Sequence, residues 1–162
     1  MLMEINKELN MKTRIKNKAI IFLLLCFVSC SNSSQIENDI DLINKVFTAV
    51  KEHNTGNISF SNLTNFDWDN VCIFSPYTPV DSINSALGFN WELSDKTNLQ
   101  HDDVICLIVF MKGKDVVKYL LYPRSKGDFS ALNERCYSRE KAVYKVEERD
   151  NKGKVWYVIK NK

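Results

Sequence analysis

The chain has 162 residues, of which 44% are hydrophobic, and 22 Lys or Arg against 20 Asp or Glu give a net charge of +2. The first 29 residues hold five of the basic and two of the acidic groups, so residues 30–162 carry 17 basic and 18 acidic groups. A balance this close to neutral provides no electrostatic basis for nucleic-acid binding. The length from residue 30 onward fits one domain with a single hydrophobic core.

The N-terminal segment has the order of an export signal. Residues 11–30, MKTRIKNKAIIFLLLCFVSC, contain a basic head, a ten-residue apolar run over 19–28, and a small residue followed by cysteine. The apolar run is too short for a permanent membrane span, which needs about 20 apolar residues. We expect translation to start at Met11, because residues 1–10 are a mixed acidic and basic lead that signal heads lack.

The end of this segment, Phe27-Val28-Ser29-Cys30, resembles the signal of bacterial lipoproteins, where a short apolar and small-residue sequence directly precedes a lipidated cysteine. The resemblance implies cleavage before Cys30, a diacylglyceryl thioether on its sulfur and a further acyl chain, such as palmitate, on its amine. Each buried methylene contributes about 0.8 kcal/mol, so two or three chains anchor a protein stably. Cys26 is the rival acceptor, and an ordinary secreted protein cut nearby is the alternative.

We therefore expect three parts. Residues 1–29 form a signal peptide, residues 30–36 are the lipidated cysteine with a polar linker, and residues 37–162 form a single α+β domain. The resemblance implies a protein anchored in the bacterial cell envelope. Ser31 is not acidic, which by analogy favours the outer membrane, facing the periplasm, over retention in the inner membrane.

Two helices are predicted from periodicity. Between residues 36 and 53, apolar side chains recur every three or four positions, with acidic residues early and basic residues late, as the helix dipole prefers. A short helix is expected near residues 79–87, with the Thr78 hydroxyl as its cap, Pro79 at its first position and a stop at Gly88.

The strands are predicted from shorter apolar runs. Two hairpins are expected, one joining residues 104–111 to 116–122 and one joining 142–149 to 154–160 through a four-residue loop. Residues 104–111 are apolar on both faces, as in a central strand that is covered on both sides. With shorter strands near residues 58–61 and 71–74, the prediction is an antiparallel sheet of four to five strands, with the long N-terminal helix packed on one face.

The remaining cysteines leave alternatives open. Cys72 and Cys106 lie in apolar runs and are most simply small buried hydrophobic side chains, whereas Cys136 lies in a polar stretch that favours an exposed thiol. Three cysteines in an oxidising compartment allow at most one internal disulfide. Its pairing stays open at this point.

No catalytic or metal-binding pattern is recognisable. The two histidines are His53, at the end of the long helix, and His101, beside Asp102 and Asp103 at the entry to the central strand. The sequence contains no zinc pattern, calcium loop, phosphate-binding glycine loop or paired-carboxylate signature, so we expect no metal and no cofactor. An enzyme would need a site of another kind, using Cys136, Arg135 or His101.

The densest aromatic block is residues 67–79, DWDNVCIFSPYTP, with Leu87-Gly88-Phe89-Asn90-Trp91 after it. This block resembles one in small bacterial lipoproteins, and the resemblance implies an envelope location and an α+β fold but no activity. Its aromatic side chains either line a groove for a partner or pack inside the domain. The candidate partner contacts are Trp68, Pro76, Tyr77, Thr78 and Trp91 from this block, with Arg124, Arg135 and Arg139 from the loop over residues 124–139.

Two function classes remain. The first is a non-catalytic envelope lipoprotein that binds, supports or inhibits another envelope protein or ligand. The alternative is an envelope enzyme with a site in the 124–139 loop or around His101. No nucleic-acid partner is expected.

Overall fold

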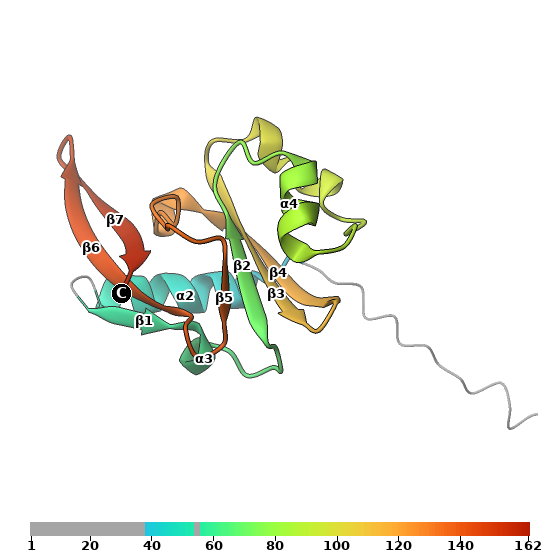
Figure 1. Cartoon of the computed structure of the whole chain (residues 1–162). Helices are drawn as coiled ribbons and strands as arrows, with labels where there is room; N and C mark the ends of the chain where they lie inside the picture. Colours follow the sequence, from blue (N-terminus) through green and yellow to red (C-terminus); the bar gives the residue numbers. More distant parts are fainter. Residues whose placement is uncertain (1–37, 54–55) are drawn as a thin grey trace, which may run out of the picture. The chain divides into compact units, whose positions relative to one another are not determined.

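The computed structural model describes residues 38–53 and 56–162, which belong to one compact unit spanning Ile36–Lys162. The predicted signal peptide, Cys30 and the whole predicted linker over residues 30–36 lie outside the described residues. The described chain is an α+β domain with helices and two antiparallel sheets (Figure 1). This confirms the expected fold class and corrects the expectation of a single sheet.

The larger sheet has four strands in the order β4-β3-β2-β5. The strands are β2 (Asn70–Phe74), β3 (Ile105–Lys112), β4 (Asp115–Pro123) and β5 (Cys136–Ser138). The β3–β4 hairpin forms as predicted, and β2 pairs with β3 on its other side. Among the described strands, β5 pairs only with β2, through three residue pairs, so it is a short edge strand.

Both faces of β3 are buried. Cys106, Ile108 and Phe110 contribute to one hydrophobic core, whereas Leu107, Val109 and Met111 contribute to a second core on the opposite face. This alternation follows from the strand geometry, in which successive side chains point to opposite sides. The sheet is therefore the middle layer of the domain, as the continuous apolar run of this strand predicts.

Two helices cover the two faces of this sheet (Figure 1). Helix α2 (Ile40–Glu52) packs in the first core, and helix α4 (Val80–Leu87) packs in the second. The expected long helix over 36–53 is not supported, because Asp39 accepts a hydrogen bond from the Leu42 amide at 2.8 Å and caps the helix there. Asn38 instead bridges to Tyr119 of β4.

The start of α4 also differs from the prediction. Pro79 is the residue that precedes the helix, and its backbone is extended. The Thr78 hydroxyl does not cap the helix, because it donates to the Ser75 carbonyl at 2.7 Å. The end agrees with the prediction, since Gly88 has a φ of 80°, a conformation that glycine adopts without strain.

The second sheet has three strands in the order β1-β6-β7. They are β1 (Asn57–Ser59), β6 (Val143–Asn151) and β7 (Lys154–Asn161), and the helix α3 (Phe60–Leu63) follows β1 directly. The β6–β7 hairpin reaches out from the rest of the domain (Figure 1). Its loop has two residues, Lys152 and Gly153, rather than the four predicted, because both adopt positive φ and close a tight turn.

The expectation of a single sheet was wrong because periodicity identifies each hairpin but does not show which strand pairs with its outer edge. In the structure, β5 takes the free edge of β2, and β1 pairs with β6. The two hairpins therefore lie in different sheets, and side chains of both sheets meet in the first core.

An ion pair joins the two sheets. Arg124 begins the short 3₁₀ turn η3 (Arg124–Lys126), and its amide donates to the Val104 carbonyl beside β3 at 2.9 Å. Its guanidinium donates to both carboxylate oxygens of Asp128, at 3.1 and 2.7 Å. The backbone of Asp128 in turn bonds to Tyr157 and Ile159 of β7. Through this pair, the end of the larger sheet is connected to the smaller one.

The Asp128 carboxyl is ionised in this setting. Burial opposes its charge, but hydrogen bonds from Arg124 and Ser130 outweigh burial and hold the pKa of Asp128 below its usual value. A carboxylate whose pKa is lower in the folded protein adds stability above the ordinary pKa of about 4, and this contribution is lost as the pH falls below it.

Replacing Asp128 by Asn should lower the free energy of unfolding by about 2–3 kcal/mol at pH 7, because Arg124 loses its charged partner. The difference between wild type and variant should shrink as the pH falls from 5 to about 3. Urea unfolding across this pH range measures both effects. The exposed carboxylate Asp95 provides the control, since Asp95→Asn should leave the stability almost unchanged. A difference that stays constant down to pH 3 would contradict the role of this pair.

Candidate functional site

A groove lies between two segments that are about 55 residues apart in the sequence. Its volume is about 390 Å³. One wall is the turn over residues 75–79, and the other is the loop over residues 132–135. Ile73 and Phe129 complete the lining. Both segments were predicted as candidate contact regions, and the structure places them side by side.

The first wall follows directly after β2. The chain turns at Pro76 and Tyr77 before α4 begins, and the Tyr77 amide donates to the Leu99 carbonyl at 3.0 Å. Tyr77 has a φ of 61°, which is a strained conformation for a large side chain. Its side chain is nevertheless 61% exposed, so burial of the ring does not explain the strain. Strained backbone held in place by its surroundings occurs preferentially at functional sites.

The second wall is held by hydrogen bonds from β2, β5 and the end of β7. The Ile73 amide donates to the Arg135 carbonyl at 2.7 Å. The Tyr137 hydroxyl donates to the Glu134 carbonyl at 2.8 Å and accepts from the Asn161 amide group at 2.9 Å. The side-chain Oδ1 of Asn161 also accepts from the Asn133 amide of the loop, at 2.8 Å. The loop is therefore positioned before any ligand arrives.

A disulfide connects the two strands next to the groove. Cys72 of β2 and Cys136 of β5 are opposite each other in the sheet, and their sulfur atoms are bonded. This corrects the expectation of an exposed thiol at Cys136 and of a simple hydrophobic role for Cys72. The chain-entropy model gives about 4 kcal/mol for a closed loop of this size, with a sequence separation of 64. Cys106 stays a free, buried thiol, and burial raises its pKa to about 12.

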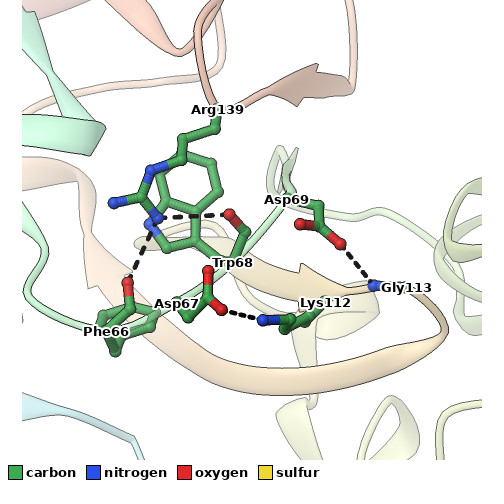
Figure 2. A network of polar contacts seen from close by, with 7 residues as sticks. All are labelled: Phe66, Asp67, Trp68, Asp69, Lys112, Gly113 and Arg139. Atoms are coloured by element: carbon green, nitrogen blue, oxygen red, sulfur yellow. Dashed lines mark hydrogen bonds and ion pairs between the residues drawn. The ribbon is translucent and has the colours of Figure 1, made fainter.

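Two of the expected contacts, Trp68 and Arg139, instead hold each other inside the domain (Figure 2). The Trp68 side chain is 1% exposed, and its Nε1 donates to the Thr64 hydroxyl at 2.8 Å. The Arg139 guanidinium lies 4.9 Å from the Trp68 ring centroid and donates to the carbonyls of Phe66 and Trp68, each at 3.3 Å. Burial of Trp68 corrects its assignment as a partner contact.

Further polar contacts tie this cluster to the β3–β4 turn (Figure 2). Asp67 forms an ion pair with Lys112, and the Gly113 amide donates to the Asp69 carboxylate at 2.9 Å. The Asp69 carbonyl accepts from the Arg139 amide at 2.8 Å. These contacts hold residues 66–69, which lead into β2, in place. We call Trp68, Arg139 and the carbonyls of Phe66 and Trp68 the Trp68–Arg139 clamp.

Trp91 and Arg124 are also engaged within the domain. Trp91 is 6% exposed and packs edge-on against Tyr119, with ring centroids 5.4 Å apart, so it is corrected in the same way as Trp68. Arg124 is occupied by Asp128 and lies with its guanidinium carbon 5.9 Å from the Trp156 ring centroid. Of the eight predicted contacts, the groove gathers Pro76, Tyr77, Thr78 and Arg135.

The residues of the enzymatic alternative are not arranged as a nucleophile and base. The Cys136 sulfur is held in the disulfide, so it is not a thiolate in the oxidised protein. His101 is exposed on the 3₁₀ turn η2 (Leu99–His101). Across the part of the chain that the structure describes, no three His, Cys, Asp or Glu side chains are grouped to hold a metal ion. No helix in the same part is long and apolar enough to cross a membrane.

The exposed lining of the groove is more polar than apolar, so the groove can bind polar groups together with one small apolar group. Ile73 and Phe129 are buried and expose little apolar surface, Leu132 is half-buried, and Glu134 and Arg135 place opposite charges on the same loop. Sequence reasoning missed Leu132 and Phe129 because the loop has no clear period. For the other wall, the sequence did indicate a contact region, because Pro76 and Pro79 flank Tyr77 in a turn. Comparison with protein-family models, curated proteins and solved structures finds no match to this chain.

Replacing Arg139 by Gln should lower the free energy of unfolding by about 1–2 kcal/mol, because two carbonyl contacts and the stacking on Trp68 are lost. Denaturant unfolding followed by tryptophan fluorescence measures the change. Arg135→Gln is the matched control, since this arginine is exposed on the groove and its loss should change stability by less than about 0.5 kcal/mol. Equal losses in the free energy of unfolding for Arg139→Gln and Arg135→Gln would contradict a stabilising role of the Trp68–Arg139 clamp.

Proposed function

We propose that the protein is a lipid-anchored lipoprotein of the bacterial cell envelope that binds a peptide segment of a partner protein in the groove, without catalysis. The observation that carries this proposal is Tyr77, which is strained and exposed at the rim of a preformed groove. Tyrosine is among the residues that contribute most to protein interfaces, because a rigid ring buries a large area at a low cost in entropy.

The lining indicates the chemistry of the partner. A volume of about 390 Å³ accommodates one or two side chains rather than a folded surface. The exposed Tyr77 ring and the half-buried Leu132 suit one apolar side chain of the partner, and Glu134 and Arg135 on the loop wall suit polar or charged groups beside it. A mainly polar extended segment that carries one apolar residue fits these features.

The disulfide supports the envelope location. Structural disulfides form and persist in oxidising compartments and are rare in the cytoplasm. Cys72 and Cys136 are paired, which agrees with a chain that is exported before it matures. The export signal and Cys30 supply the route and the anchor in this proposal.

Replacing Tyr77 by Gly separates binding from stability. Glycine adopts a φ of 61° without strain, so the free energy of unfolding should stay the same or rise by up to about 1 kcal/mol. Partner binding should fall by at least about tenfold, because the exposed ring is lost. Binding is followed in cells as photo-crosslinking from a photoreactive amino acid placed at Asn133, on the facing wall.

Val155 supplies the matched control for this experiment. It is an exposed apolar residue, 57% accessible, on the β6–β7 hairpin outside the groove. Val155→Ser should leave crosslinking from position 133 unchanged. Crosslinked products that are insensitive to Tyr77→Gly, or no products at all, would contradict binding in the groove.

Replacing Cys30 by Ala tests the anchor. The substitution should abolish labelling by radioactive palmitate and release the protein from the membrane fraction, because no thioether can form. Cys26→Ala is the control and should retain both labelling and membrane association. A Cys30→Ala variant that still labels and sediments with membranes would refute the assignment.

A further inference from the structure

The disulfide lies directly beside the contact that joins the two walls of the groove. Cys72 precedes Ile73, which lines the groove, and Cys136 follows Arg135 of the loop. The hydrogen bond from the Ile73 amide to the Arg135 carbonyl is therefore one residue away from the disulfide on each strand. The disulfide that holds Cys136 against Cys72 therefore also holds the loop wall over residues 132–135 against the turn wall over residues 75–79.

Apart from the disulfide, this wall is held mainly through Tyr137, whose side chain is buried in the first core and whose hydroxyl bonds to Glu134 and Asn161. The strand β5 has three residues, and within the described part of the chain it pairs only with β2. Residues 133–135 are exposed, and the side chain of Asn161 supplies the contacts from the smaller sheet. Short edge strands with exposed flanks open locally at a low cost in free energy, while the central strands of a sheet open only with the whole domain.

We infer that the groove is complete only in the oxidised protein, so that the Cys72–Cys136 disulfide controls the binding site. Oxidation fixes the wall over residues 132–138, and reduction releases this wall while the β2–β3–β4 part of the sheet stays folded. The inference rests on the proposed function, because it takes the groove as the binding site. It adds that binding is restricted to the compartment in which the disulfide forms.

The redox step is a thiol–disulfide exchange. The two cysteine thiols lose two electrons and two protons to a disulfide-bearing oxidant through a mixed disulfide, and the oxidant leaves as a dithiol. In the reverse direction, a dithiol reductant attacks the Cys136 sulfur, which is less buried than that of Cys72. Cys72 leaves as a thiolate and takes a proton, and the second thiol of the reductant releases Cys136. Cys106 is fully buried in the first core, whereas Cys72 belongs to the second core on the opposite face of the sheet. The Cys106 thiol is therefore not positioned to exchange with the disulfide.

Hydrogen–deuterium exchange of the full chain in detergent, with and without a phosphine reductant, tests the inference without a ligand. Reduction should accelerate exchange at the amides of Ile73, Tyr137 and Arg139, which bond across the β2–β5 contact, by at least about tenfold. The amides of Ile108 and Leu120 in the central hairpin should change by less than about twofold. The double variant Cys72→Ala/Cys136→Ala should exchange like the reduced protein in either condition, and Cys106→Ala should keep the response to reductant.

Two results would overturn the inference. Unchanged exchange on reduction would show that the wall holds without the disulfide, and uniform acceleration at all amides would show that reduction unfolds the whole domain. Neither result depends on a partner. If Tyr77→Gly leaves crosslinking unchanged while reduction still loosens residues 132–138, the proposed function fails and the redox response of the wall remains.

Discussion

The burial of both faces of β3 is the constraint on which the rest of the structure depends. A strand that presents apolar side chains to both sides must be covered twice. Helix α4 covers one face, and helix α2 together with the smaller sheet covers the other. Because β3 lies between β2 and β4 and bonds to both, it holds these two strands in place. The turns that follow them begin at fixed positions. The groove wall that follows β2 is one of these turns.

The charged and aromatic side chains divide between structure and surface. Arg124 and Arg139 are used internally, one to connect the sheets through Asp128 and the other to cover Trp68. Arg135 and Tyr77 are exposed on opposite walls of the groove. A site that combines a strained residue on one wall with a disulfide-held loop on the other is preorganised, and preorganisation lowers the entropy that binding must overcome.

Part of the site could be predicted from local sequence. The Pro76-Tyr77-Thr78 turn was identified because prolines restrict the chain and an aromatic residue between them is conspicuous. The loop over 124–139 was identified only as a segment without a period. Burial of Trp68 and Trp91 was not decided by their sequence neighbours, since an aromatic residue fits a core and an interface equally well. The Cys72–Cys136 pair joins residues 64 positions apart, and spacing alone does not select it.

The sequence by itself determined the α+β class, both hairpins, the doubly covered central strand and the stop of α4 at Gly88, because each depends on local periodicity or on one backbone conformation. The tertiary structure alone decided the division into two sheets, the disulfide partner and the meeting of two distant segments at one groove. These features depend on which strand edges pair, and pairing is set by contacts between residues far apart in the chain, which a local pattern does not encode.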